Sequence, residues 1–427
     1  MTHITETAGV GPRRAVLAGI RLAADSGFDR SMKELKGLAE ACGVEVCGSA
    51  EQARLKEDPA YAIGRGKVDE IKKAADTLEA NIVIFNNTLS PSQLSNLSNA
   101  LDIEVIDRTM LILNIFAERA KSREAMMQVD YAKLKYMLPR LVGLRSNLSR
   151  QGGTGGTISN RGSGEKKIEL DRRVIEKRMT LLRRELDSIS KIRDTQTKKR
   201  LRSGLPLVSL VGYTNAGKST LMNLILSTFS TDDEKRVESE DMLFATLDTS
   251  VRRIEIPGMR PFLLSDTVGF ISDLPTMLID AFHSTLNEAL NADLLLEVID
   301  ASDPDRENHI KVTESTLAEL GAGNIPIIQI MNKADITPDT VPDSDGTIAV
   351  SAVTGKGLDS LIRRIRSALD DGHVRVALLI PWKDSGAESR LRAAATVLSS
   401  EYTDNGILIT ALLDRSRVGE YQRFILP

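Results

Sequence analysis

The stretch Gly212-Tyr213-Thr214-Asn215-Ala216-Gly217-Lys218-Ser219-Thr220 decides the fold of this chain. An apolar run, residues 206–211, precedes it, and a helix-like run, residues 221–226, follows it. This order of strand, glycine-bounded loop, Lys-Ser and helix predicts a phosphate-binding loop. Glycines let backbone N–H groups curl around a phosphate, while Lys218 supplies a positive charge and Ser219 a hydroxyl ligand for Mg²⁺. We therefore expect this loop to bind the phosphates of a nucleotide.

A second motif predicts which base is bound. Asn332-Lys333-Ala334-Asp335 follows the strand-like run 327–331. The Asp335 carboxylate can accept hydrogen bonds from the N1–H and the amine of guanine, a donor pair that adenine lacks. The Lys333 stem can lie on the base while Asn332 braces the loops. Since ligands bind at the carboxyl ends of strands in such sheets, we also expect a backbone N–H of Ser351-Ala352-Val353 to meet the guanine O6.

The stretch Asp266-Thr267-Val268-Gly269 follows another strand-like run, residues 261–265. A carboxylate at that strand end is expected to hold Mg²⁺ through a water molecule. The Gly269 N–H can reach the γ-phosphate. Together with the loop described above, these residues predict a site for GTP and Mg²⁺.

A switch segment is predicted at Phe244-Ala245-Thr246-Leu247-Asp248. Thr246 is the candidate for the threonine that closes on Mg²⁺ only when the γ-phosphate is present. Thr249 is the competing candidate. Thr246, Lys218 and Gly269 are the residues that we expect to act on the γ-phosphate.

Two positions bear on the rate of hydrolysis. Phe270 stands four residues after Asp266, where Ras-type switches carry a water-positioning glutamine. Whether or not Phe270 packs in the core, that hydrogen-bonding group is missing, so slow hydrolysis that a partner accelerates is expected. Asn215 either binds K⁺ beside the phosphates or only braces its loop.

The composition bounds the class of protein. The chain has 427 residues, of which 41% are hydrophobic and 27% charged, as expected for a soluble protein of several domains. No apolar run approaches the roughly 18 residues that cross a bilayer, and no basic-then-apolar signal segment opens the chain. Cys42 and Cys47 are the only cysteines, which excludes a disulfide framework and a four-cysteine zinc site. We expect a cytoplasmic monomer, with ribosome or membrane association as a further possibility.

The charge is unevenly distributed. Residues 121–203 contain 22 Lys or Arg against 9 Asp or Glu, a net charge of +13 in a chain whose total is −3. One basic segment inside an otherwise acidic protein indicates a surface for a polyanion.

The fold class predicted is α/β, in four domains. A small α/β domain (residues 1–110) precedes a long helical hairpin (111–203), a P-loop GTPase domain (204–371) and a small α/β domain (372–427). Helical spacing continues from Arg108 to Leu148, and a long charged helix is predicted from Glu165 to Arg200. The C-terminal domain is expected to hold a helix from Ser385 to Ser399.

The hairpin contains a glycine-rich stretch, residues 151–164. Six glycines in fourteen residues predict a mobile loop rather than a helix or strand. It is either a finger between two basic helices or a linker between domains, and the flanking charge favours the finger. A weaker glycine-basic motif, Gly64-Arg65-Gly66-Lys67, is either a second phosphate site or a plain turn.

These motifs together resemble the HflX family of translation-factor-class GTPases. The resemblance rests on Gly212 to Ser219, on residues 244–248 and 266–271, on Asn332 to Asp335, and on the glycine-rich stretch with Arg161-Gly162-Ser163-Gly164-Glu165. The sequence departs from the family at two positions. The family usually has Pro where Thr249 stands, and Gly-Pro-Gly-Glu-Thr where this chain has Gly-Ser-Gly-Glu-Lys.

The resemblance implies a GTPase that binds the large (50S) ribosomal subunit and its rRNA, through the N-terminal domain and the glycine-rich loop. It also implies that the GTP-bound form splits or rescues stalled ribosomes, often under stress. The rival interpretation is an assembly or signalling switch that binds a protein partner without RNA. The ribosomal interpretation predicts salt-sensitive binding to large subunits that weakens when Arg161, Lys166 and Lys167 lose their charge. The rival predicts no such loss.

Overall fold

The computed structural model describes residues 12–22, 27–141, 159–229, 244, 250–272, 290–337 and 347–426. These residues form two compact units. One unit holds the described residues up to Lys191 together with Phe244 and Ser272, and the other holds the remainder. Each unit is described by itself.

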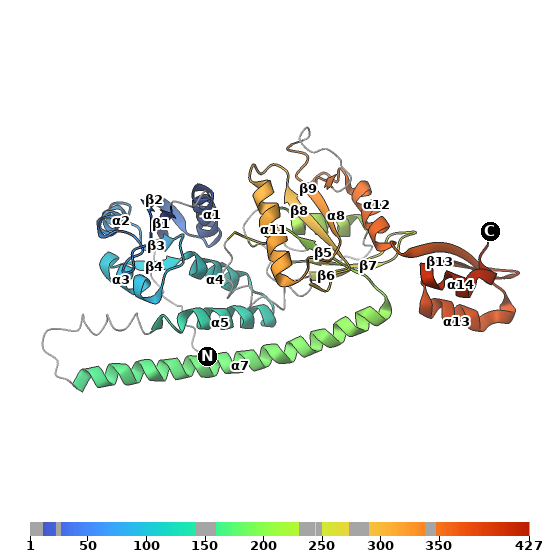
Figure 1. Ribbon diagram of the computed structural model, residues 1–427, viewed down its shortest axis with the longest axis horizontal. Coiled ribbons are helices and arrows are strands. Elements are labelled where there is room, and N and C mark those ends of the chain that lie inside the picture. The colour runs from blue at the N-terminus through green and yellow to red at the C-terminus, as the bar shows by residue number, and fades with distance from the viewer. Residues whose placement is uncertain are drawn as a thin grey trace. The chain divides into compact units, whose positions relative to one another are not determined.

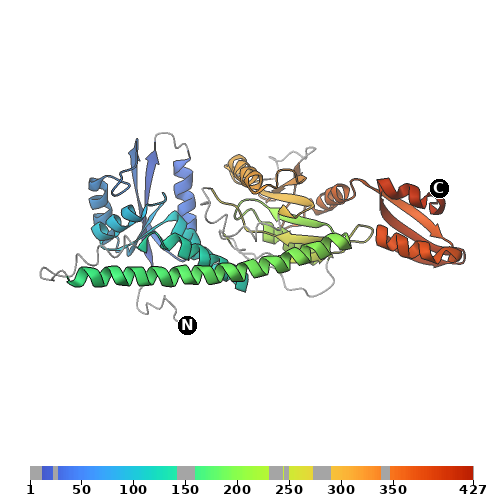
Figure 2. The same cartoon turned by 60° about the horizontal axis from the view of Figure 1, so that its bottom comes forward.

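The first unit contains a four-stranded parallel sheet with strand order β2-β1-β3-β4. Helices α2 and α3 lie on one side of it, and α1 and α4 lie on the other (Figures 1 and 2). Buried aliphatic and aromatic side chains fill the space beneath both pairs of helices. The elements are β1 (Arg14–Leu22), α1 (Phe28–Ala41), β2 (Glu45–Arg54), α2 (Arg65–Thr77), β3 (Ile82–Phe85), α3 (Pro91–Leu101), β4 (Glu104–Asp107) and α4 (Arg108–Arg119).

The helical segment that follows differs from the sequence-based expectation in two places. The helical pattern from Arg108 is two helices, α4 and α5 (Arg123–Met137), because the Ser122 hydroxyl accepts a hydrogen bond from Ala125 N–H and caps a new helix. The long charged helix α7 (Ser159–Ser203) starts earlier than predicted.

The prediction that glycines exclude a helix throughout residues 151–164 is therefore wrong for residues 159–164, which belong to α7. A glycine costs about 1 kcal/mol in a helix, and extending a helix that already exists is easy, so a long helix can include two of them. Residues 151–158 lie outside the described residues.

The second unit is built on a six-stranded sheet with strand order β10-β9-β8-β5-β7-β6, parallel except for β6. The strand before the phosphate-binding motif, β5, lies in the middle of it. A core cluster of buried hydrophobic residues lies on one face of the sheet, because its strand members alternate along each strand, and the helices that cover this face complete it. The elements are β5 (Leu207–Val211), α8 (Lys218–Phe229), β6 (Ser250–Ile254), β7 (Phe262–Asp266), β8 (Leu294–Asp300), α11 (Arg306–Leu320), β9 (Ile327–Asn332), β10 (Thr347–Ala349) and α12 (Leu358–Leu369).

A three-stranded antiparallel sheet, in the order β11-β13-β12, forms the C-terminal part. The helix predicted from Ser385 to Ser399 ends at Ala394, and a strand follows at once. The prediction was wrong there because Thr396 and Val397 are β-branched and favour a strand over a helix. The elements are β11 (His373–Ile380), α13 (Ser385–Ala394), β12 (Thr396–Thr403), β13 (Gly406–Asp414) and α14 (Val418–Tyr421).

Among the helices of the described residues, none is apolar over a length that could cross a membrane.

Candidate nucleotide-binding site

The loop between β5 and α8 has the backbone of a phosphate-binding loop. Gly212 has φ +137° and Gly217 has φ +90°, values that favour glycine. A Cβ on Gly212 would lie 2.3 Å from the Val298 carbonyl oxygen, and one on Gly217 would lie 2.2 Å from Asn332 Nδ2. The first turn of α8, which starts at Lys218, directs its free N–H groups toward the same loop.

Lys218 lies buried inside this loop. Its Nζ donates hydrogen bonds to the carbonyl oxygens of Gly212 (3.1 Å) and Tyr213 (2.7 Å). Burial lowers the pKa of Lys218 to about 8, although the nearby Asp266 carboxylate raises it. An ammonium group in this position can exchange carbonyl oxygens for phosphate oxygens, which are stronger acceptors because they are charged.

Tyr213 holds the phosphate-binding loop against α11. Its ring is buried and stacks on His309 of α11, with ring centroids 3.8 Å apart and an angle of 10° between the planes. Asn215, at the tip, is exposed and has φ +61°. Thr214 and Ala216 are buried on either side of it.

Two oxygen donors suited to Mg²⁺ meet below the loop. The Ser219 hydroxyl donates a hydrogen bond of 2.6 Å to Asp266 Oδ2, at the carboxyl end of β7. Asp266 is fully buried. Within the described ranges, no group of three or more Asp, Glu, His or Cys side chains is placed to hold a metal ion by itself. None is needed, because Mg²⁺ beside a nucleotide uses few protein ligands and several phosphate and water oxygens.

The segment after Asp266 runs against the loop. Phe270 N–H donates to the Gly212 carbonyl (3.0 Å), and Thr214 N–H donates to the Phe270 carbonyl (2.8 Å). A Cβ on Gly269 would lie 2.9 Å from Lys218 Nζ, so the backbone there comes close to the lysine. The Phe270 side chain is 3% exposed and packs in the core.

The two intervening residues differ from Gly269. The Thr267 hydroxyl donates to the Leu210 carbonyl (2.6 Å), and Val268 is buried. The side chains of Thr267 and Val268 therefore stabilise the segment that follows Asp266. Any contact of these two residues with a nucleotide would come from the backbone.

The base-reading motif is joined to the phosphate loop through Asn332. Its Nδ2 donates to the Ala216 carbonyl (2.8 Å), and its Oδ1 accepts from Ala352 N–H (3.0 Å). One side chain therefore braces both neighbouring loops, as expected from the sequence. Ala334 is buried, whereas Asp335 is exposed and open to a ligand.

The third predicted loop has fewer available donors than expected. Ser351 N–H donates to the Lys356 carbonyl (2.9 Å), and Ala352 N–H is engaged by Asn332. The Val353 side chain is 78% exposed. Of the three residues predicted to donate a backbone N–H to the guanine O6, Val353 is the remaining candidate.

The predicted switch segment is described at one residue only. Phe244 is 2% exposed, and its ring meets that of Phe116 in α4 edge to face, with centroids 4.6 Å apart. Ala245, Thr246, Leu247, Asp248 and the competing Thr249 lie outside the described residues. In the same unit, Arg108 Nη2 donates to the Ser272 carbonyl (3.1 Å).

One residue beside the base-reading motif was missed in the sequence. Asp300 ends β8 and is the register partner of Asn332 on β9. Its Oδ2 lies 2.7 Å from Lys333 Nζ. The available signal was an acidic residue at the carboxyl end of an apolar strand, the position at which such sheets bind ligands.

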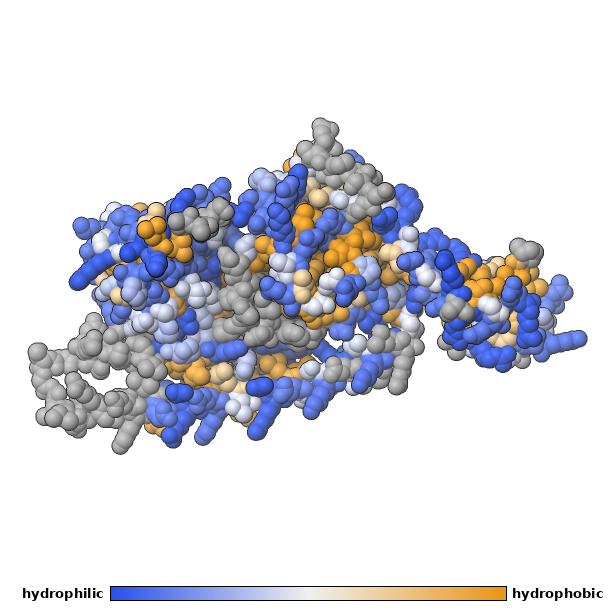
Figure 3. Space-filling model, viewed as in Figure 1, coloured by the Kyte–Doolittle hydropathy of each residue, from blue (hydrophilic) through white to orange (hydrophobic). Residues whose placement is uncertain are grey.

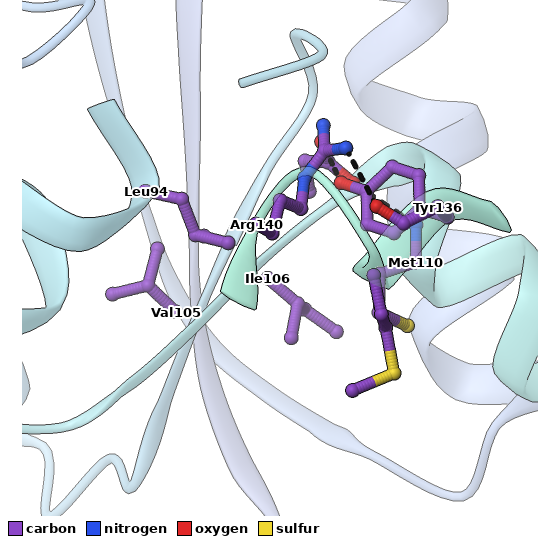
Figure 4. A pocket seen from close by; sticks show the side chains of 8 residues that line it. Leu94, Val105, Ile106, Met110, Tyr136 and Arg140 are labelled. Atoms are coloured by element: carbon purple, nitrogen blue, oxygen red, sulfur yellow. Dashed lines mark hydrogen bonds and ion pairs between the residues drawn. The ribbon is translucent and has the colours of Figure 1, made fainter. Parts of the chain in front are cut away.

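A pocket in the N-terminal unit is a second concave feature of the protein (Figure 4). It has a volume of about 140 Å³, below the 300 Å³ or more of ordinary ligand sites. Arg140 and Tyr136 lie together, away from the apolar Leu94 and Val105. Tyr136 Oη donates to Asp107, and Arg140 Nη2 donates to the Leu89 carbonyl (2.6 Å). Burial and Asp107 raise the pKa of Tyr136, so its proton stays in this contact.

Three family models match the chain. They are described as GTP-binding GTPase N-terminal (residues 29–117), GTP-binding GTPase Middle Region (119–200) and 50S ribosome-binding GTPase (207–333). The GTPase HflX of Caldanaerobacter subterraneus is 41% identical over 398 residues, covering 93% of this chain and 90% of the relative. The GTPase HflX of Escherichia coli K12 is 38% identical, covering 88% of each chain.

Among the solved structures compared with the chain is a GTP-binding protein from the archaeon Sulfolobus solfataricus in complex with GDP. It is 25% identical, covers 84% of this chain and 99% of its own, and superposes with a TM-score of 0.43. With so low a score, the fold assignment rests on the strand order and on the sequence matches.

Proposed function

Because the chain belongs to the HflX family of GTPases, we propose that this GTP-hydrolysing enzyme acts on the large (50S) ribosomal subunit. The observation that carries the proposal is the match of residues 207–333 to a 50S ribosome-binding GTPase, in a chain whose preceding segment has a net charge of +13. The proposed outcome is splitting or rescue of stalled ribosomes by the GTP-bound form. We further propose a monomer that works in the cytoplasm.

In this proposal the phosphates bind between the backbone of residues 212–217 and the Lys218 ammonium group. Ser219 would hold Mg²⁺ directly and Asp266 would hold it through water, since these oxygens already lie together. The metal would supply positive charge to the β- and γ-phosphate oxygens. Gly269 N–H and Thr246 are proposed to meet the γ-phosphate, and Asp335 to select guanine.

Hydrolysis by the isolated protein should be slow. Phe270 stands where a glutamine orients water in Ras-type switches, and its side chain is buried and cannot do so. A partner that completes the site can raise the rate of such enzymes by about 10³–10⁵-fold. Two residues of α4 make these contacts: Phe116 packs on Phe244, and Arg108 donates to the Ser272 carbonyl. A partner that moves α4 would therefore act on Phe244 and on Ser272 together.

The surface proposed to meet rRNA is α7. Among its described basic side chains, Lys177, Arg183 and Arg184 are exposed, and hydrophilic side chains project from it in Figure 3. Several other arginines form exposed ion pairs, such as Arg172 with Glu176 (2.9 Å). Exposed pairs contribute only about 0–1 kcal/mol, so a phosphate can replace the carboxylate at little cost.

Co-sedimentation with 50S particles in a GTP analogue or GDP, over a salt series, tests this proposal. The double variant Arg183→Gln/Arg184→Gln should weaken binding and lower the salt slope by about 1 for each phosphate that the variant no longer neutralises. The matched control is Arg363→Gln/Arg364→Gln, which removes two exposed charges from α12. Equal weakening in both variants, or no binding by the wild type, would favour a switch that acts on a protein partner.

We also propose that K⁺ binds at Asn215, beside the phosphates. Its exposed amide and left-handed backbone place a neutral oxygen donor at the tip of the loop. GTP turnover in KCl should then exceed turnover in NaCl, and Asn215→Ala should abolish the difference. Equal turnover in the two salts would mean that Asn215 only braces its loop and binds no K⁺.

A further inference from the structure

Asp300 and Lys333 form an ion pair at the carboxyl edge of the second sheet. The Asp300 Oδ2 and Lys333 Nζ atoms lie 2.7 Å apart, and the side chains are 18% and 25% exposed. The pair follows from the sheet itself, because Asp300 and Asn332 are register partners on the neighbouring strands β8 and β9. Lys333 is the next residue after Asn332.

The Asp300 carboxylate is itself held in one orientation. Its other oxygen, Oδ1, accepts hydrogen bonds from Ser302 N–H (2.9 Å) and from the Ser302 hydroxyl (2.6 Å). One oxygen therefore fixes the carboxylate, and the second oxygen faces the lysine. Such a division is what a group that orients another side chain requires.

Lys333 is constrained at both ends. Its backbone has φ +62°, a conformation that is unfavourable for a lysine, and its ammonium group is tied to Asp300. A free lysine loses much rotamer freedom when it is ordered, so fixing it before the ligand arrives lowers the cost of binding. The methylene stem between the two fixed ends is a ready apolar surface.

We propose that Asp300 is a positioning residue for the nucleotide base: it holds the Lys333 stem as the surface on which guanine lies. This inference rests on the proposed guanine site at Asp335 and adds a residue to it. Asp300 contacts Lys333 and not the reacting atoms. It should therefore affect binding equally in the ground state and the transition state.

The variant Asp300→Asn tests the proposal, because the amide oxygen can still accept from Ser302 while the negative charge is lost. We expect GDP to bind about tenfold more weakly. In GTP turnover, KM should rise by a similar factor with kcat unchanged. Asp371→Asn is the matched control. Asp371 is exposed and follows the end of α12, so this variant removes one carboxylate from the same unit without touching the nucleotide loop or its support.

A double-mutant cycle separates positioning from a general structural effect. Lys333→Met keeps an apolar stem and removes the ammonium group, so Asp300→Asn should cause no further loss of GDP affinity in that background. If the losses of the two single variants simply add, or if Asp371→Asn weakens GDP binding as much as Asp300→Asn does, the proposal is overturned.

The guanine assignment is tested separately with Asp335→Asn, whose amide can donate to the 2-carbonyl of xanthine. This variant should shift preference from GDP to xanthosine diphosphate. If that preference does not shift, the guanine site itself is wrong. If it shifts but Asp300→Asn binds GDP normally, only the role of Asp300 is wrong.

Discussion

Two glycine-basic motifs stand at the start of a helix in this chain, and they are built differently. In the N-terminal unit, Gly64 N–H donates to Gln52 Oε1 (2.8 Å) and Lys67 Nζ pairs with Glu70 (2.8 Å). In the second unit, Lys218 Nζ donates hydrogen bonds to two carbonyl oxygens of its own loop, those of Gly212 and Tyr213. A charged partner already satisfies Lys67, whereas Lys218 gains one when a phosphate arrives. Arg65, Gly66 and Lys67 form the first turn of α2 and Gly64 is its N-cap, so the expectation of a plain turn is corrected to a helix start. The difference in partners argues against a second phosphate site at Gly64 to Lys67.

The largest expected effect comes from removing each lysine in turn. Lys218→Ala should weaken GDP binding by about a hundredfold or more, since charge-assisted hydrogen bonds to the phosphates are lost. Lys67→Ala should leave GDP affinity unchanged. Isothermal titration of both variants measures this, and weaker binding by Lys67→Ala would show that the N-terminal loop also binds nucleotide.

The glycines sharpen the same comparison. Gly217→Ala should weaken GDP binding by roughly thirtyfold, because φ +90° and the 2.2 Å approach to Asn332 exclude a Cβ. Gly66 lies in α2, and a Cβ there would meet no atom within 4 Å. Gly66→Ala should instead raise the free energy of unfolding of the N-terminal unit by about 0.5–1 kcal/mol. Titration with GDP checks the first variant and denaturant unfolding the second, and equal behaviour of the two would contradict the distinction.

The two sheets also differ in their central strands. In β3 all four residues are buried and apolar, whereas β8 carries the buried Glu297, which accepts from Gln329 Nε2 (3.1 Å). Burial raises the pKa of Glu297 from 4.5 to about 7. The folded state therefore disfavours the ionised form, and this penalty is absent below about pH 4.5 and complete above about pH 7. Glu297→Gln should stabilise the protein by about 1–3 kcal/mol at pH 8 and by much less at pH 5, which denaturant unfolding at the two pH values measures.

The smallest effect concerns the proton on Lys218. Its pKa of about 8 without ligand should rise when phosphates bind, so binding takes up a proton at pH values near and above 8. GDP affinity should be flat below that pH and should fall by less than about tenfold from about pH 7.5 to 8.5. Titration calorimetry in two buffers of different ionisation enthalpy measures the uptake. Lys218→Met should show none.

Local motifs made much of this structure predictable. The loop from Gly212 to Ser219 directly follows β5 and leads into α8, so its role could be inferred from one continuous stretch of sequence. Asn332 was expected to brace two loops, and it does so through hydrogen bonds to Ala216 and Ala352.

What the sequence could not predict depends on contacts between distant segments. Asp300 meets Lys333 because β8 lies beside β9, an order that only the folded sheet determines. The amides of Ser351 and Ala352 looked available but are used within the protein. Thr396 and Val397 favour a strand and the alanines before them favour a helix, and the pairing of Thr396 with Leu412 of β13 fixes where the strand begins.

The central claim is that the nucleotide loop works for a ribosomal partner bound through the basic segment. GTP turnover by the full chain, with and without 50S subunits, tests it most directly. We predict at least about a tenfold stimulation by 50S subunits in the wild type, markedly reduced in Arg183→Gln/Arg184→Gln and retained in Arg363→Gln/Arg364→Gln. Equal turnover with and without 50S subunits would contradict the account.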